Sequence, residues 1–280
     1  MSAVQRKSTP FRILQRASML AKLNPFNGDG DIVFYEPTHR YTVKGKRVRI
    51  SVTALGARAV PAEHKFDGLK IIRSNLNSWR ANASNKHHSM VVGVSDDEAI
   101  SAIFKSWDRT RNLGTGMHKA FEQHLNDETV EKESEFAHEM AHLRASLATM
   151  PDMKPVRTEM SVYANDKDGD AAVAGQIDLV MRDGDGAYHI YDFKRTATDL
   201  SPNAHSYGKT FLGDLPLNDH HKYSLQLSLY SVMFELQTGH AIKSCKLLQI
   251  HPELDEYQLV EATDLQKDAR MLLESVDVSF

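Results

Sequence analysis

The residues best suited to chemistry stand in the segment IYDFKR, over residues 190–195. Alternate side chains of a β-strand share a face, so Asp192 and Lys194 project together. Beside a divalent cation, the carboxylate can bind the ion while the lysine addresses a water molecule or a phosphate oxygen. An ordinary surface ion pair is the commoner explanation of an isolated Asp-x-Lys, so a functional interpretation depends on further residues.

A second carboxylate lies fourteen residues earlier, in the segment GQIDLV over residues 175–180. Aspartate is unfavourable in the middle of a strand, and it is costly to bury unless it is paired or binds a metal. The short DGDG turn at 183–186 makes the two strands neighbours, so Asp178 and Asp192 can converge. Two converging carboxylates need a cation, because otherwise one of them must protonate. Oxygen-rich coordination favours Mg²⁺ or Mn²⁺.

Two predicted helices add polar side chains to this pair. The segment GTGMH at 114–118 begins a helix in which His118 and Glu122, four residues apart, share a face. The strongly apolar helix predicted over 219–238 carries Gln226 and Tyr230 on one face. A single histidine on a helix is usually a packed or surface residue, and a Gln–Tyr pair usually has no function, so neither signal identifies a site by itself.

Taken in order, these motifs resemble the PD-(D/E)XK nuclease superfamily, specifically its RecB-like exonuclease branch. Order and spacing fit that branch over residues 114–235, on GTGMH (114–118), Glu159, GQIDLV (175–180), YDFKR (191–195) and QLSLY (226–230). The upstream segment HRYTVKGKRVRISVT is similar to the N-terminal part of phage, viral and mitochondrial nucleases of this group.

The resemblance implies a metal site. His118, Asp178 and Asp192 would be ligands of one or two Mg²⁺ or Mn²⁺ ions, and the main-chain carbonyl of Phe193 would complete the site. Aspartate at 192 stands where the family more often has glutamate, and its reach is shorter. The iron–sulfur cluster of some relatives is excluded, because its four cysteines cannot come from a chain whose single cysteine is Cys245.

The remaining residues receive supporting roles from the same resemblance. Lys194 would position or help deprotonate the attacking water, or stabilise charge on the phosphoryl group. Gln226 and Tyr230 would support the site or contact the DNA strand, with Glu122 and Glu159 as secondary candidates. Three basic groups and the basic N-terminal segment are either phosphate contacts or solvated surface charges: Arg195, Lys209 and Lys222.

The activity implied is metal-assisted hydrolysis of DNA phosphodiester bonds that leaves a 5′-phosphate. We expect an exonuclease that acts on DNA ends or single strands, with DNA and replication or recombination proteins as partners and no membrane. A structure-specific endonuclease with the same site stays open as an alternative. So does a non-catalytic nucleic-acid-binding module, although the complete set of site residues argues against it.

These side chains need a scaffold, and the pattern predicts an α/β fold. We expect a central mixed β-sheet flanked by helices, with a helical N-terminal elaboration. The family resemblance implies that this core is restriction-endonuclease-like. The segment 32–51 predicts a hairpin or meander, and helical periodicity follows from 52 to about 150. Within it, helices are expected from Asp96 towards Trp107, from about Gly114, and over 131–149. The later part predicts strands over 156–163, 173–182, 187–195, 244–251 and 256–261, with helices over 219–238 and 263–274.

Length and composition set the limits of this interpretation. The 280 residues carry a net charge of −3 and a single cysteine, and no run of eighteen apolar residues predicts a membrane span. Residues 1–28 are basic and contain no acidic residue, which fits a phosphate-following arm, a mitochondrial targeting segment or a solvated terminus. We expect one nuclease domain over 29–280, with a hairpin and helical part over 29–150 and a catalytic core over 112–262. Its expected location is intracellular, with DNA: the bacterial cytoplasm if it is phage-encoded, or the mitochondrion.

Overall fold

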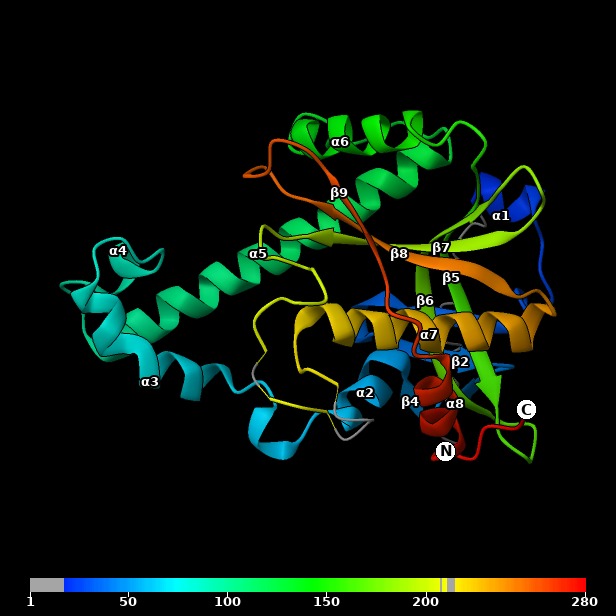
Figure 1. Cartoon of the computed structure of the whole chain (residues 1–280), viewed down its shortest axis with the longest axis horizontal. Coiled ribbons are helices and arrows are strands. Elements are labelled where there is room, and N and C mark those ends of the chain that lie inside the picture. The colour runs from blue at the N-terminus through cyan, green and yellow to red at the C-terminus, as the bar shows by residue number, and fades with distance from the viewer. Residues whose placement is uncertain (1–17, 207, 211–214) are drawn as a thin grey trace, which may run out of the picture.

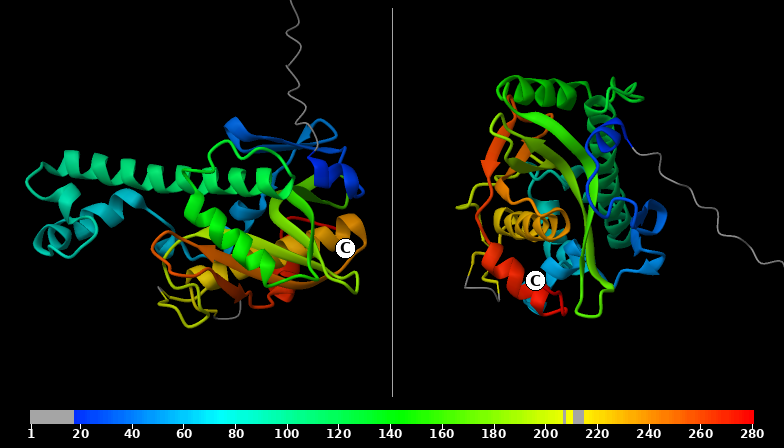
Figure 2. Two further views of the ribbon diagram at one scale, coloured as in Figure 1. Left: turned by 90° about the horizontal axis from the view of Figure 1, so that it is seen from above. Right: turned by 90° about the vertical axis from the view of Figure 1, so that its right-hand side faces the viewer.

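A central six-stranded mixed sheet organises the computed structural model, which describes residues 18–206, 208–210 and 215–280. Helices cover both faces of this sheet (Figures 1 and 2), so the predicted fold class is confirmed. The strands are β4 (Ile50–Ser51), β5 (Lys154–Asn165), β6 (Ala171–Arg182), β7 (Tyr188–Arg195), β8 (Ile242–Ile250) and β9 (Gln258–Glu261).

Part of one edge of β6, between the residues that pair with β4 and those that pair with β7, has no partner among the described strands. Strands β5, β6 and β7 form an antiparallel meander, and helix α7 (Asp219–Thr238) carries the chain across to β8, which is parallel to β7. Strand β5 pairs along one edge of β6. On the other edge, β4 pairs with residues 173–174 and β7 with residues 179–182. The ladder between β6 and β7 ends at the pair Leu179 and Tyr191, and beyond this pair the two strands separate.

Apolar side chains fill two layers around the sheet. One core packs the sheet against α7, α2 (Val52–Gly56) and α8 (Gln266–Glu274), and the other packs it against α5 (Asp96–Leu125) and α6 (Ala137–Ala148). Because β6 and β7 contribute buried side chains to both cores, their backbones are fixed from both sides. The predicted strands and the predicted α7 are confirmed in this arrangement.

A helical arm extends away from the sheet (Figure 1). It consists of α3 (Gly68–Ala81), α4 (His88–Val91) and the first half of α5, and it has a small core of its own around Ile72, Trp79 and Ile103. Before the arm, β1 (Ile32–Tyr35), β2 (Arg40–Val43) and β3 (Lys46–Arg47) form the predicted meander. Three short 3₁₀ turns complete this part of the chain: Glu36–Thr38, Ala57–Ala59 and Ala62–His64.

Two expectations about helix ends are wrong. The sequence predicts separate helices before and after Gly114, but α5 is one helix of 30 residues. A capping box of Ser95 and Glu98 starts it, and Gly116 is required within it because an added Cβ would lie 2.6 Å from Cζ of the buried Phe136. This glycine therefore serves a packing contact rather than a helix start. Helix α6 begins at residue 137 rather than 131, after a series of turns.

The basic N-terminal segment falls partly outside the described residues, which begin at 18. From there the chain packs closely: α1 (Met19–Leu23) buries Leu20, whose N–H donates to Asn126 Oδ1 at 3.0 Å, and Phe26 packs edge-on against Tyr188 and Phe234. The last part of the predicted arm, residues 18–28, is thus joined to the body of the protein. Among the described ranges, none of the helices has the length and apolar character needed to cross a bilayer.

We predict that the two glycines of α5 respond oppositely to alanine. Gly114→Ala should stabilise the protein by about 0.5–1 kcal/mol, since nothing lies within 4 Å of the added Cβ and alanine favours helix. Gly116→Ala should be about 1–3 kcal/mol less stable than Gly114→Ala, because its methyl group overpacks Phe136. Urea unfolding followed by circular dichroism measures both, and equal midpoints would contradict this account of Gly116.

Candidate active site

The point where β6 and β7 separate holds the first two candidate residues. Asp178 and Asp192 each lie one residue beyond the last ladder pair, on facing strands. The N–H of Phe193 has left the ladder with β6, and it donates to Asp178 Oδ2 at 2.8 Å. A buried N–H without a strand partner must find another acceptor, and a carboxylate is a strong one. The point where β6 and β7 separate, called the strand fork from here on, therefore fixes the orientation of Asp178.

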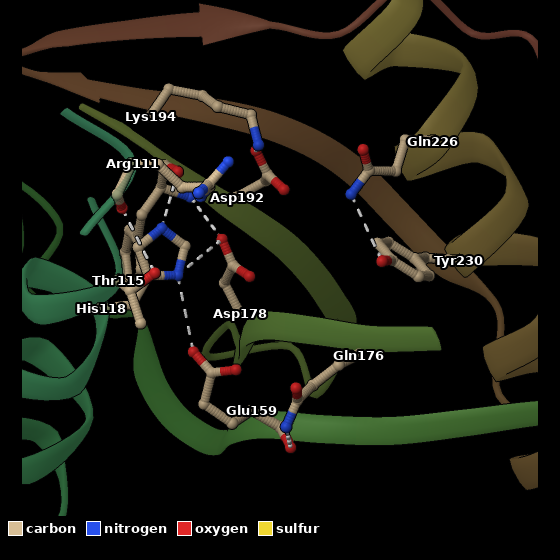
Figure 3. Close-up of polar contacts among 11 residues, drawn as sticks. Arg111, Thr115, His118, Glu159, Gln176, Asp178, Asp192, Lys194, Gln226 and Tyr230 are labelled. Atoms are coloured by element: carbon tan, nitrogen blue, oxygen red, sulfur yellow. Dashed lines mark hydrogen bonds and ion pairs between the residues drawn. The ribbon is translucent and has the colours of Figure 1, made fainter. Parts of the chain in front are cut away.

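Helix α5 brings His118 to this fork (Figure 3). Its Nε2 lies 3.1 Å from the carbonyl oxygen of Phe193, while its Nδ1 lies 3.7 Å from Asp178 Oδ2 and 3.6 Å from Glu159 Oε1. The donor atoms of His118, Glu159 and Asp178 all lie within 4.8 Å of one another, which makes these three partly buried residues a group able to hold a metal ion. Glu159, a secondary candidate in the sequence, thus joins the centre of the site.

Glu159 is placed by an unusual backbone conformation. The pairs on either side of it in β5 are regular, Thr158 with Leu179 and Met160 with Ile177, so Glu159 lies opposite Asp178. Its φ of 45° is in the left-handed region, which is rare for a residue with a side chain. The side-chain amide of Gln176 donates to the carbonyl of Glu159 at 3.0 Å. This hydrogen bond supports a conformation that the strand alone does not favour.

Buried negative charge dominates the electrostatics of the group. Burial would lower the pKa of His118, but the carboxylates of Asp178 and Glu159 raise it to about 9. Burial raises the pKa of Asp178, and it raises the pKa of Asp192 to about 6 although Lys194 acts in the opposite direction. Charged carboxylates are therefore disfavoured here without a cation, and a divalent ion would relieve their repulsion.

Asp192 and Lys194 form a pair beside the group. Lys194 Nζ lies 2.5 Å from Asp192 Oδ2 and 4.3 Å from the ring centroid of Tyr223. In Figure 3 the Asp192 carboxylate meets Lys194, while the carboxylates of Asp178 and Glu159 meet His118. The metal-ligand role of Asp192 stays a prediction, as does that of the Phe193 carbonyl, whose oxygen lies against His118.

Helix α7 places Gln226 and Tyr230 at the other side of the view in Figure 3. The Gln226 amide donates to the Tyr230 hydroxyl at 3.3 Å. Burial raises the pKa of Tyr230 well above its ordinary value, and the charges of Asp178 and Asp192 add to this effect. Gly175 allows the close approach, since an added Cβ would lie 2.6 Å from Tyr230 Cε1. The supporting or DNA-contacting roles of both residues stay predictions.

Sequence reasoning missed two residues near the group, Tyr41 and Gln176. Burial and the carboxylates of Glu159 and Asp178 raise the pKa of Tyr41 to about 12, so this residue of β2 lies within their electrostatic reach. The resemblance of the segment around Tyr41 to related nucleases was the signal available. Gln176 lies two residues before Asp178 in GQIDLV, but its bond to Glu159 depends on a strand register that no local pattern reveals.

Other candidates have partners of their own. Arg195 forms a buried ion pair with Glu139 at 2.9 Å, and Lys222 Nζ lies 2.7 Å from Asp219 Oδ1. Lys209 lies in a short bridge to Pro216. Their phosphate contacts stay predictions.

A model of one protein family matches this chain. It describes the PD-(D/E)XK nuclease superfamily and covers residues 95–276, which is 182 of the 280 residues and includes every residue of the three-member group. The chain belongs to the PD-(D/E)XK nuclease superfamily. A solved structure described as "Crystal structure of SSO0001" is similar over 60% of this chain and 68% of that chain, with 15% sequence identity and a TM-score of 0.28. No curated protein matches the sequence.

Membership in the PD-(D/E)XK superfamily implies a nuclease, a hydrolase of phosphodiester bonds. Nucleases of this superfamily generally use divalent metal ions, and the donor set is suited to one: two carboxylates and an imidazole in a partly buried cluster. The chemistry of these donors, rather than any bound ion, is the basis of this assignment. The RecB-like branch within the superfamily stays a prediction.

We predict that Gln176 affects metal affinity through Glu159. Gln176→Leu removes the amide that supports the Glu159 backbone, so Mn²⁺ affinity measured by isothermal titration calorimetry should fall roughly 10-fold, as losses outside the ligand set commonly do. In a Glu159→Ala background, the same substitution should change the affinity little. Equal losses in both backgrounds would mean that Gln176 acts independently of Glu159.

A second prediction concerns Glu122, which lies outside the three-residue group. Burial, with Glu159 and Glu128 nearby, raises its pKa to about 7. A carboxyl group whose pKa is raised on folding costs stability as pH rises from about 4.5 through 7. Glu122→Gln should therefore match the wild type near pH 4 and be more stable at pH 8, by about 1–2 kcal/mol after solvent screening. Chemical unfolding in EDTA tests this, with the exposed Glu274→Gln as a control expected to show no pH-dependent gain.

Proposed function

We propose that this protein is a metal-dependent deoxyribonuclease that works as an exonuclease on DNA ends or single strands. The observation that supports it most is the group His118, Glu159 and Asp178 at the strand fork, with Lys194 on the adjoining strand. Family membership supplies phosphodiester hydrolysis. The choice of DNA and of end-directed cleavage rests on the sequence resemblance.

His118, Glu159 and Asp178 would hold the ion. When bound, Mg²⁺ or Mn²⁺ supplies Lewis-acid polarisation of the phosphoryl oxygens and a more acidic water molecule. Without a metal the raised pKa of His118 keeps its ring protonated at neutral pH, so metal binding would displace the Nδ1 proton. The Nε2 proton can stay on the Phe193 carbonyl, and Nδ1 would then present a lone pair beside the two carboxylates. Asp178 is held by the Phe193 N–H, so its orientation is fixed before the ion binds. This degree of pre-organisation supports a catalytic role for the group.

Lys194 would act as a donor towards the reacting groups. Burial opposes its charge, but Asp192 and Asp178 raise its pKa above the ordinary value, which keeps the side chain an ammonium. An ammonium donates hydrogen bonds, so Lys194 suits orientation of the attacking water and stabilisation of charge on the phosphoryl oxygens. Asp192 and the Tyr223 ring hold its Nζ from two sides.

The biological setting belongs to the same proposal. DNA is the expected partner, together with replication or recombination proteins, and the expected location is intracellular. The basic composition of residues 1–28 suits either a DNA-following arm or a mitochondrial targeting segment. Comparing nuclease activity and organellar import of the full chain and of a chain that starts at residue 18 would distinguish these two uses.

The activity is tested on end-labelled linear DNA and on circular DNA, single- and double-stranded, with Mg²⁺, Mn²⁺ or EDTA. We expect degradation of linear DNA only, abolished by EDTA. Lys194→Ala should lower the rate roughly 10²–10⁴-fold, since it removes a donor to the reacting centre. The matched control Lys267→Ala, at an exposed lysine of α8, should cleave like the wild type. Cleavage of circles would indicate the endonuclease instead, and DNA left intact with both metals would exclude the deoxyribonuclease and favour the non-catalytic nucleic-acid-binding module.

A further inference from the structure

Three aromatic residues form a cluster at the base of the helical arm, with Phe66 and Phe104 exposed and Trp107 half-buried against the core of the arm. Phe66 lies just before α3, with its ring centroid 5.7 Å from that of Trp107, and the Phe104 ring meets Trp107 edge-on at 5.6 Å. Phe66 is 76% exposed and Phe104 is 38% exposed. Gly68 brings the backbone close to both rings of α5, because an added Cβ would lie 3.0 Å from each. Large aromatic surfaces left open to solvent mark sites of interaction.

Basic residues outnumber acidic residues in the segment that carries this cluster. Residues 65–111 contain eight Lys and Arg against five Asp and Glu, a net charge of +3 within a chain whose net charge is −3. Six basic side chains within seven residues of Phe66, Phe104 or Trp107 are exposed: Lys65, Lys70, Arg73, Lys105, Arg109 and Arg111. Two acidic residues, Asp67 and Asp108, are exposed in the same stretches. Aromatic faces interleaved with basic groups suit single-stranded nucleic acid, whose bases stack on the rings while its phosphates meet the charges.

The same helix connects the cluster to the candidate active site. Trp107 and His118 are eleven residues apart in the continuous helix α5 (Figure 1). At 100° and 1.5 Å per residue, they lie within roughly 20° of one face and about 16 Å apart. Arg111 lies on this face between them, one turn after Trp107, where its exposed guanidinium pairs with Asp108 at 2.7 Å, an ion pair that a phosphate would replace. A line of aromatic, basic and metal-binding side chains thus follows α5.

We infer that, given the proposed nuclease activity, this line binds the substrate as a single strand. Phe66 and Trp107 stack on an unpaired base, and Arg111 contacts a phosphate between that base and the scissile bond. The distance of about 16 Å corresponds to about five nucleotides at the 3.4 Å rise of a stacked strand, and to fewer in a stretched one. Bases in a duplex are stacked on one another, so the aromatic faces select single strands over duplex DNA.

Binding is tested without cleavage, by fluorescence anisotropy of the full chain in EDTA. The probes are a fluorescein-labelled 12-nucleotide oligothymidylate and a blunt 12-base-pair duplex. Phe66→Ala should weaken oligothymidylate binding about 5- to 50-fold and leave duplex binding unchanged, whereas Phe66→Trp, which keeps a stacking face, should bind like the wild type. The matched control is Phe280→Ala, at a 52% exposed phenylalanine that packs on Arg270 of α8. Quenching of Trp107 fluorescence by the oligonucleotide provides a second readout.

The inference and the proposed function fail in different ways. If Phe66→Ala binds oligothymidylate as tightly as the wild type, the proposal of a stacking surface is wrong. The same result is expected if the cluster binds a protein partner instead. If the wild type binds the oligonucleotide through Phe66 but cleaves no DNA with either metal, the surface stands and the nuclease proposal fails. Because Phe66 is mostly exposed, its substitution should leave the midpoint of thermal unfolding unchanged, which confirms that a loss of binding is not a loss of fold.

Discussion

The two backbone groups of Phe193 hold the candidate site together. Its N–H donates to Asp178, and its carbonyl oxygen lies against Nε2 of His118. Both groups are available because the ladder between β6 and β7 ends at Tyr191, two residues before Phe193. The aromatic ring of Phe193 is buried and meets the rings of His118 and Phe121 edge-on. Packing of one side chain thus anchors the peptide groups that orient two candidate metal ligands, His118 and Asp178.

This arrangement is electrostatically unfavourable without a cation. Burial raises the pKa of Asp178 and of Asp192, so both carboxylates resist ionisation where they stand. His118 and Lys194 supply positive charge, and their pKa values rise in response. The left-handed backbone of Glu159 adds conformational strain at the same place. The buried carboxylates and the strained backbone lower stability, so their occurrence together points to a role other than stability. The two cores on either side of the sheet hold the backbone rigidly enough to keep these groups in place.

The sequence predicts the parts of this structure that follow from local pattern. Strands β5 to β9 and helix α7 are recognisable because alternation, turn residues and a long apolar segment are properties of adjacent residues. Asp178 and Asp192 stand out because aspartate is unfavourable in an apolar strand and costly to bury unless it is paired or binds a metal. The continuity of α5 escapes local analysis, since two glycines suggest a helix start. The reason for Gly116 is a contact with Phe136, twenty residues away.

The central position of Glu159 could not be predicted from local sequence either, for a related reason. Its value to the site depends on the β5–β6 register, on its left-handed backbone and on the amide of Gln176, and all three are properties of the assembled sheet. No periodicity within 154–165 distinguishes this glutamate from one facing solvent. The family resemblance ranked it below Asp192, because Asp192 belongs to the more recognisable motif.

The unbroken course of α5 has a consequence for specificity. His118 belongs to the half of this helix that packs on the sheet, and Trp107 belongs to the half that forms the arm. A rigid helix keeps the distance and the angle between them constant, which two helices joined at Gly114 would not. The chemistry proposed for the strand fork is directed at a phosphodiester group, which every nucleic acid carries. If the proposed activity holds, we therefore expect selection among substrates to depend on surfaces at a fixed distance from the strand fork, and α5 is the element that sets that distance for the cluster at Trp107.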